Sequence, residues 1–381
     1  MGLLLILMKA GLVLTGGGAR GAYQAGVLKG IAAICKNKRN PFSVLAGTSA
    51  GAISSAFLAA QSTDFHQGAN ELAELWESIA FDDIFSTRFG TLARTGFKWI
   101  YQTSMNSETH SPANYLLDTS PLGQFLEKKI NFKNIENSIQ NKNLSGIAIS
   151  TTNYLTGTEI VFYNGDDKIQ DWIRSNRISR KVSIGIEHIM ASSAIPVFFP
   201  PIKLEDSFYG DGAIRMRNPL SPAIHLGAKK ILAIGVRQRK TRSELLTMNE
   251  GKMNEVHLSN IAGVLLNGLF LDSLEADVER LSRINRTLET TEVSSDGLQK
   301  IDCLYISPSE DLAAHAEGSL QRFPRTLRYL LSGIGSNHEG SLDLISCLAF
   351  EKEYTKSVIE LGVRDAMNHK EKIEAFLLDS Q

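Results

Sequence analysis

Cysteine is scarce in this chain: its 381 residues contain three, Cys35, Cys303 and Cys347. They lie far apart in apolar segments and are odd in number, which argues against a disulfide framework. None is grouped with any of the eight histidines in a spacing typical of zinc sites, so we expect no metal. The pattern predicts buried free thiols in a protein of a reducing compartment.

The chain also has almost no net charge, with 40 basic and 41 acidic side chains. This balance argues against nucleic acid as the main partner. The charges are unevenly distributed, because residues 1–63 contain no acidic side chain and Asp64 is the first. The opening segment therefore carries only positive charge, which favours any anion bound beside it.

A long hydrophobic run is missing as well. The apolar stretch from Met1 to Met8 is too short to span a bilayer and lacks the basic start and the cleavage site of a signal peptide. We interpret it as the lead-in to a first strand, with Met1 or Met8 as the natural start. We expect a cytoplasmic protein, free or peripheral at a membrane, and leave open its oligomeric state and export without a signal peptide.

The most informative stretch that is present covers residues 42–60, where an apolar strand pattern runs through Gly-Thr-Ser-Ala-Gly into a helical pattern. Small residues two positions before and after a serine, here Gly47 and Gly51 around Ser49, are typical of a nucleophile elbow. The amides of the following helix would point at the group that the serine attacks. We predict Ser49 as a catalytic nucleophile, the alternative being a glycine-rich structural turn.

A second glycine-rich segment lies between a strand pattern at 10–14 and a helical pattern at 22–34. Consecutive glycines can present backbone N–H groups to an anion, either a dinucleotide phosphate or an acyl-transfer oxyanion. The dinucleotide interpretation calls for an acidic ribose ligand that is absent before Asp64, although Lys36, Lys38 or Arg39 would suit a phosphorylated ribose. The oxyanion interpretation fits an elbow at the same sheet edge. The loop residues are Gly16, Gly17, Gly18, Ala19, Arg20 and Gly21.

Asp211 lies between two glycines in an otherwise apolar stretch. A surface turn is the commonest context of Asp-Gly, but the apolar flanks favour a positioned carboxylate. An aspartate with an ordinary pKa near ~3.9 is a weak base, so Phe208 and Tyr209 would have to desolvate it. The basic opening segment would instead favour its ionised form, and these two effects on its pKa oppose each other.

The remaining segments predict the surroundings of these motifs. We expect a hairpin at 145–163, a helical stretch before residue 191, strands at 230–236 and 301–306, and helices at 325–334, 341–350 and 354–376. The aromatic-rich section at 81–101 is predicted as a helical layer or as a flap that touches lipid. Phe198 and Phe199 would wall an acyl pocket, and Ser192 and Ser193 are interpreted as capping or packing residues.

Taken together, the glycine loop at 16–21, the elbow at 47–51 and Asp-Gly-Ala at 211–213 resemble the patatin-like phospholipases. The tail is similar to that of bacterial members. The resemblance implies an α/β fold with a mostly parallel central sheet sandwiched by helices. It further implies a catalytic domain at residues 8–240 and a helical C-terminal region at 241–381 that has one further strand and packs on that domain.

For the chemistry, the resemblance implies a serine lipid acyl hydrolase that cleaves fatty acyl esters of phospholipids, lysophospholipids or related lipids without a cofactor. Ser49 would be the nucleophile and Asp211 the general base of a dyad, with Gly212 and Ala213 completing the motif of the base. The 16–21 loop and Ala50 would supply the oxyanion hole. The expected partners are a lipid substrate and, transiently, a membrane surface. One departure is Arg-Met-Arg-Asn-Pro at 215–219, where the family often has paired asparagines and a proline.

Two other functions stay open on the sequence. One is an NADP-binding protein that uses the glycine loop, and the other is a catalytically silent lipid-binding module. A triad through His188 or His225 is disfavoured, because both histidines lie in apolar helical patterns that suit packed side chains.

Overall fold

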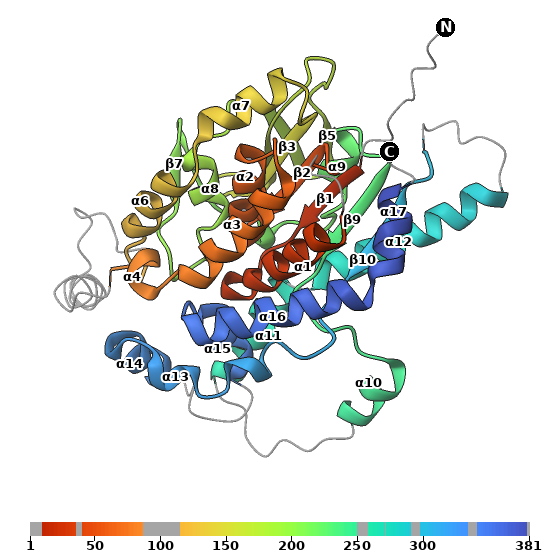
Figure 1. Cartoon of the computed structure of the whole chain (residues 1–381). Coiled ribbons are helices and arrows are strands. Elements are labelled where there is room, and N and C mark those ends of the chain that lie inside the picture. Colours follow the sequence, from red (N-terminus) through yellow and green to blue (C-terminus); the bar gives the residue numbers. More distant parts are fainter. Residues whose placement is uncertain are drawn as a thin grey trace, which may run out of the picture.

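The structure is a computed structural model that describes residues 10–35, 40–86, 115–249, 258–270, 272–290, 298–333 and 341–378. The described part is organised around one ten-stranded sheet in the order β10-β9-β1-β2-β3-β4-β6-β5, with a β7–β8 hairpin joined to β3 (Figure 1). The strands are β1 (Ala10–Leu14), β2 (Val44–Thr48), β3 (Gly146–Asn153), β4 (Glu159–Gly165), β5 (Ile173–Arg174), β6 (Arg177–Lys181), β7 (Ile202–Leu204), β8 (Ser207–Asp211), β9 (Lys230–Ile234) and β10 (Asp302–Ile306).

Helices cover both faces of this sheet. The first half of the chain contributes η1 (Gly18–Arg20), α1 (Gly21–Ile34), α2 (Ala50–Ala60), α3 (Phe65–Ser78), α4 (Phe81–Ile84), α6 (Ser120–Lys129), α7 (Phe132–Gln140) and α8 (Ile186–Ser192). The second half contributes η2 (Gly212–Ile214), α9 (Ser221–His225), α10 (Arg242–Asn249), α11 (Leu258–Phe270), α12 (Asp272–Thr290), η3 (Ala314–Ala316), α13 (Ser319–Arg322), α14 (Arg325–Gly333), α15 (Leu342–Leu348), α16 (Lys352–Asn368) and α17 (Lys370–Leu378). This is the predicted mixed α/β fold with a mostly parallel sheet.

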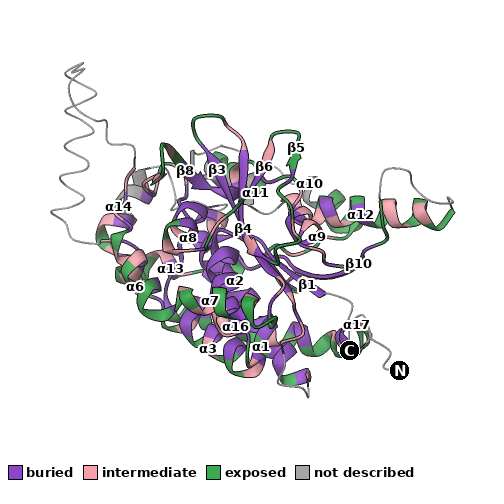
Figure 2. Ribbon diagram, turned by 90° about the horizontal axis from the view of Figure 1, so that it is seen from above, coloured by how far each residue is buried: buried purple, intermediate pink, exposed green. Residues whose placement is uncertain are grey.

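The central strands are continuous apolar runs because they are buried on both sides. Every residue of β1, β2 and β9 is buried. The core against one face joins α1, α2, α3 and α16, and the smaller core against the other face joins α9 and α12. Figure 2 shows the buried residues concentrated in the strands and on the inward sides of the helices.

Strand β3 brings two distant parts of the chain together. Its residues Gly146–Ser150 pair in parallel with β2, and Thr151–Asn153 pair antiparallel with β8. Thr151 and Thr152 also pair with β4, so β8 must lie on the same side of β3 as β2. Strands β2 and β8 therefore approach each other end to end beside β3, and the residues that follow β2 meet the residues that end β8.

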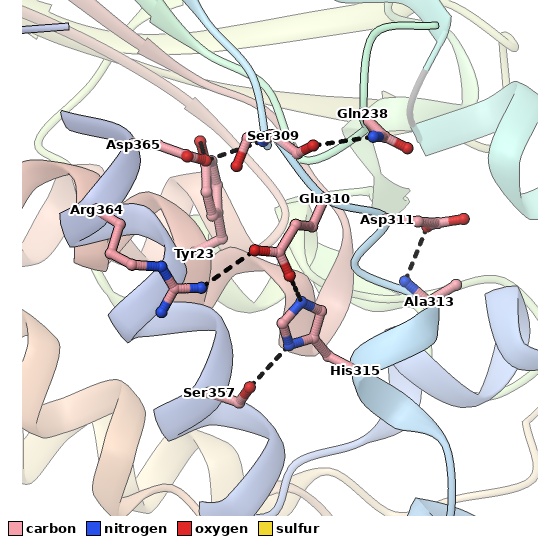
Figure 3. A network of polar contacts seen from close by, with 10 residues as sticks. All are labelled: Tyr23, Gln238, Ser309, Glu310, Asp311, Ala313, His315, Ser357, Arg364 and Asp365. Atoms are coloured by element: carbon pink, nitrogen blue, oxygen red, sulfur yellow. Dashed lines mark hydrogen bonds and ion pairs between the residues drawn. The ribbon is translucent and has the colours of Figure 1, made fainter. Parts of the chain in front are cut away.

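The C-terminal part is attached through α16, which packs along α1. Buried Asp365 of α16 accepts hydrogen bonds from the Tyr23 hydroxyl of α1 and from the Ser309 N–H after β10, both at 2.9 Å. Around it, Glu310 pairs with Arg364 at 3.3 Å and with His315 at 3.1 Å (Figure 3). The contacts tie α1, α16 and the segment after β10 into one unit, while the boundary near residue 240 stays a prediction.

Two predictions of local structure were wrong, and one hairpin was missed. The stretch before residue 191 contains β5 and β6 as well as α8, and the β7–β8 hairpin was not expected. The helix predicted at 354–376 is two helices, because α16 ends before His369, whose N–H bonds back to Asp365. The three cysteines are free as predicted, with Cys347 buried and the other two half-buried. No helix within the described ranges has both the length and the apolar character needed to cross a bilayer.

Candidate active site

Ser49 occupies a strained turn between β2 and α2. Its backbone angles are φ 54° and ψ −125°, a region that residues with a side chain rarely adopt. The small neighbours are needed for space: a Cβ on Gly47 would lie 2.4 Å from the Gly51 carbonyl oxygen, and one on Gly51 would lie 2.1 Å from the Leu14 carbonyl oxygen. The turn therefore has the steric form of a nucleophile elbow.

Asp211 ends β8 at the position where β8 meets the end of β2, and it is fully buried. Its Oδ1 accepts a hydrogen bond from the Ala213 N–H at 2.9 Å, whereas Oδ2 has no partner among the described residues. Burial raises the pKa of this carboxyl group to about 7, and the nearby Ser49 hydroxyl and the Ala213 N–H lower it in part. The serine hydroxyl and the carboxylate are thus neighbours, close enough for the hydroxyl to lower the pKa of Asp211.

A short segment at the end of α8, residues 192–194, contacts both candidate residues. The Ser192 hydroxyl accepts the Ser49 N–H at 2.9 Å and donates to the Ser150 carbonyl at 2.6 Å. The Ser193 hydroxyl donates to the Ser49 carbonyl at 3.3 Å, and the Ala194 carbonyl accepts the Asp211 N–H at 3.0 Å. This segment therefore bridges the elbow and the end of β8.

The glycine loop lies next to the elbow at the start of α1. Gly17 and Gly18 have φ of 153° and 58°. Among the described residues, no acceptor bonds the N–H groups of Gly17, Gly18 and Ala19. The Ala50 N–H, at the start of α2, likewise lacks an intrahelical acceptor. Because a Cβ on Gly21 would lie 2.8 Å from that of Ala50, α1 and α2 begin in close contact.

Helix α15 covers this loop from the far end of the sequence. The buried Arg20 guanidinium donates to the Ser346 hydroxyl at 2.9 and 2.7 Å and pairs with the Asp343 carboxylate at 2.7 Å. A Cβ on Gly18 would lie 2.1 Å from the Cys347 carbonyl oxygen, so only glycine fits beneath α15. Arg20 is one of the predicted loop residues, and its side chain packs into the C-terminal part of the chain, against α15.

A narrow apolar cavity separates the loop from α15. Gly17, Gly18 and Phe198 line it together with Ile195, Leu344, Cys347 and Leu348, and its volume is about 10 Å³. That volume is about enough for one water molecule. Phe198 lines this cavity and Phe199 is part of the core, so the acyl pocket that the two rings would wall stays a prediction.

The two histidines considered for a triad bond elsewhere. His188 accepts the Gly185 N–H at 3.0 Å and packs edge-on against Phe162, and burial lowers its pKa. His225 stacks on Trp172 against the other face of the sheet, and its burial lowers its pKa to about 4. Neither forms a hydrogen bond with Ser49 or Asp211.

Other predicted residues lie in varied surroundings. Arg215 and Arg217 are exposed, and Gly212 is pressed against the Ser150 carbonyl. Phe85 is buried and Phe81 packs on Phe323, which fits a helical layer at that point. The rest of the aromatic section, residues 87–101, lies outside the described residues, as do Lys36, Lys38 and Arg39.

Three features of the site have no signal in the sequence. Ser192 contacts Ser49 across 143 positions, and Arg20 contacts Ser346 across 326. Tyr154 is a third residue that the motifs did not indicate: its hydroxyl lies against Gly210, and burial and the Asp211 charge raise its pKa. No cluster of side chains suited to a metal occurs in the ranges that the structure covers.

The chain was compared with known proteins. The family model for patatin-like phospholipase matches residues 12–224. Among solved structures, the chain is similar to VipD from Legionella pneumophila, with 14% identity and a TM-score of 0.34 over 96% of this chain and 67% of that one. No curated protein matches. Since the family model covers more than half of the sequence, including the glycine loop, the elbow and Asp211, the chain belongs to the patatin-like phospholipase family.

Proposed function

We propose that the protein hydrolyses fatty acyl esters of phospholipids or lysophospholipids, with Ser49 and Asp211 as a catalytic dyad. The observation that carries this proposal is the meeting of a strained serine at the start of α2 with a fully buried carboxylate whose Oδ2 is unpartnered. Buried polar atoms are normally hydrogen-bonded, so an unsatisfied carboxylate oxygen beside a serine supports a role in taking its proton.

In the first step Asp211 removes the proton from the Ser49 hydroxyl while Oγ attacks the ester carbonyl carbon. The negative charge that develops on the carbonyl oxygen is stabilised by the N–H groups of Gly17, Gly18 and Ala50, and each such donor contributes about 3 kcal/mol to the transition state. The tetrahedral intermediate collapses to acyl-Ser49, and the leaving alcohol takes the proton from Asp211. Water then attacks the acyl group with Asp211 as the base, which releases the fatty acid and restores the serine.

The test is product analysis after incubation with vesicles of mixed phospholipids and, separately, with lysophospholipids. We expect free fatty acid by mass spectrometry, and Ser49→Ala should lower its release by at least about a thousandfold. Ser78→Ala, at an exposed serine at the end of α3, is the matched control and should leave the rate unchanged. Absence of fatty acid release from every lipid by folded protein would refute the proposal and favour a silent lipid-binding module.

A further inference from the structure

Helix α11 exposes an apolar face without any charge. Its residues Leu258–Phe270 include no acidic or basic side chain. Ile261, Val264 and Leu265 are 47%, 72% and 62% exposed. A surface helix normally carries charged side chains on its outer side, so an uncharged outer face indicates a surface that meets something other than water.

This helix borders the candidate active site. It packs against η2, which directly follows Asp211, and against α15, which covers the glycine loop. In Figure 1, α11 and α15 lie together below the sheet, on the side where β1, β2 and β9 end, and α10 lies apart from them at the lower right. The exposed face of α11 is therefore at the edge of the sheet that carries Ser49.

Cations flank the same edge. Residues 212–243 contain no acidic side chain. Arg215 and Arg217, which follow η2, are exposed and form no ion pair with a described residue. Four more basic residues follow β9 on the way to α10, whose Leu245 and Leu246 are 49% and 59% exposed; these four are Arg237, Arg239, Lys240 and Arg242. Of these, Arg239 pairs with Glu275 of α12 at 3.0 Å.

We propose that the exposed face of α11, with these flanking cations, is a docking surface for an anionic lipid bilayer. The proposal rests on the proposed function, because Ser49 is only 2% exposed and a lipid must be delivered to it from this edge. The apolar side chains would enter the acyl boundary while the arginines contact lipid phosphates. A second copy of the chain is disfavoured as the occupant, since an isologous contact would bring the same cations together.

The experiment measures cosedimentation of the full chain with phosphatidylcholine vesicles that contain or lack phosphatidylglycerol. All proteins carry Ser49→Ala, so the binding result does not depend on hydrolysis. We expect binding to the anionic vesicles, weakened by added salt, and at least tenfold weaker binding for Val264→Asp. The matched control is Ile173→Asp on β5 at the far end of the sheet, which should bind as the parent does; Ile173 is 70% exposed and Val264 is 72% exposed.

The outcomes separate the two proposals. Equal binding by Val264→Asp and the parent, or equal loss in Val264→Asp and Ile173→Asp, overturns the docking surface whether or not the enzyme is active. Conversion of a dimer to a monomer by Val264→Asp, with vesicle binding intact, overturns it in favour of a second copy. Loss of vesicle binding confined to Val264→Asp supports it even where no fatty acid is released, and the failure then lies with the proposed hydrolysis.

Discussion

At the scale of single residues, burial decides the properties of Asp211. On the sequence, desolvation by its apolar neighbours and attraction to the basic opening segment pull its pKa in opposite directions. In the structure the desolvation prevails and raises the pKa to about 7. A carboxylate with this pKa is a far better base toward a serine hydroxyl than an exposed aspartate, so the proposed dyad has a physical basis without a histidine.

The pH dependence of catalysis follows from this pKa. Since Asp211 must be ionised to accept the serine proton, kcat/KM should rise with pH and reach half of its plateau near pH 7. The profile is measured with a soluble short-chain ester between pH 5 and 9. A flat profile across this range would contradict the role of Asp211, and Asp211→Asn should abolish turnover at every pH.

Burial of Glu159, the first residue of β4, should make the free energy of unfolding depend on pH. It is fully buried, and its two carboxylate oxygens have no close partner among the described residues. Burial raises its pKa from 4.5 to about 7, against the lowering effects of Arg177 and the Ser150 hydroxyl. Between these values the unfolded chain has released a proton that the folded chain retains, so the folded state loses stability as pH rises. Glu159→Gln should therefore raise the free energy of unfolding by about 2 kcal/mol at pH 8 and by much less at pH 4, as measured by urea unfolding. An equal effect at both pH values would contradict this account.

At the scale of elements, the motifs with local steric demands were predictable. Gly47 and Gly51 are required by contacts within the elbow and with the neighbouring strand, so their spacing alone identifies the turn. The β7–β8 hairpin was not predictable, because its strand character comes from pairing with β3 and its turn carries Glu205 and Asp206. Likewise, no local pattern indicates that the Ser192 hydroxyl accepts the Ser49 N–H.

The hydrogen bonds of Ser192 to Ser49 and Ser150 give a prediction at the scale of elements. Ser192→Ala removes the acceptor of the Ser49 N–H and leaves two buried backbone groups without their partner, which should cost about 2 kcal/mol of stability. Because the elbow is then less well held, labelling of Ser49 by a fluorophosphonate should slow about tenfold or more. Ser193→Ala, which removes one longer bond at 3.3 Å, is the comparison and should have the smaller effect on both. The reverse order would contradict the bridge.

At the scale of the whole molecule, the C-terminal part reaches back to the N-terminal motifs. Arg20 in the glycine loop is held by Ser346 and Asp343 of α15, and Tyr23 of α1 is held by Asp365 of α16. These contacts span more than three hundred positions. The loop that would form the oxyanion hole is therefore held by helices that lie outside residues 12–224, the part of the chain that the family model matches.

Ser346→Ala tests this dependence. It leaves the buried Arg20 Nε–H without its acceptor, so the free energy of unfolding should fall by about 1–3 kcal/mol in denaturant titrations. The matched control is Ser332→Ala on α14. Among the described residues its half-buried hydroxyl bonds only to the Arg328 carbonyl of its own helix, so its loss should cost much less. Equal costs for the two variants would show that α15 is not coupled to the loop through Arg20.

The central claim is that Ser49 is an activated nucleophile although it is nearly inaccessible. Its direct test is intact-mass and peptide analysis of the full chain after reaction with a fluorophosphonate. We predict a single adduct on Ser49, absent in Ser49→Ala and strongly slowed in Asp211→Asn, while exposed serines such as Ser78 stay unmodified. Folded protein that acquires no adduct, or one on another serine, would contradict the account.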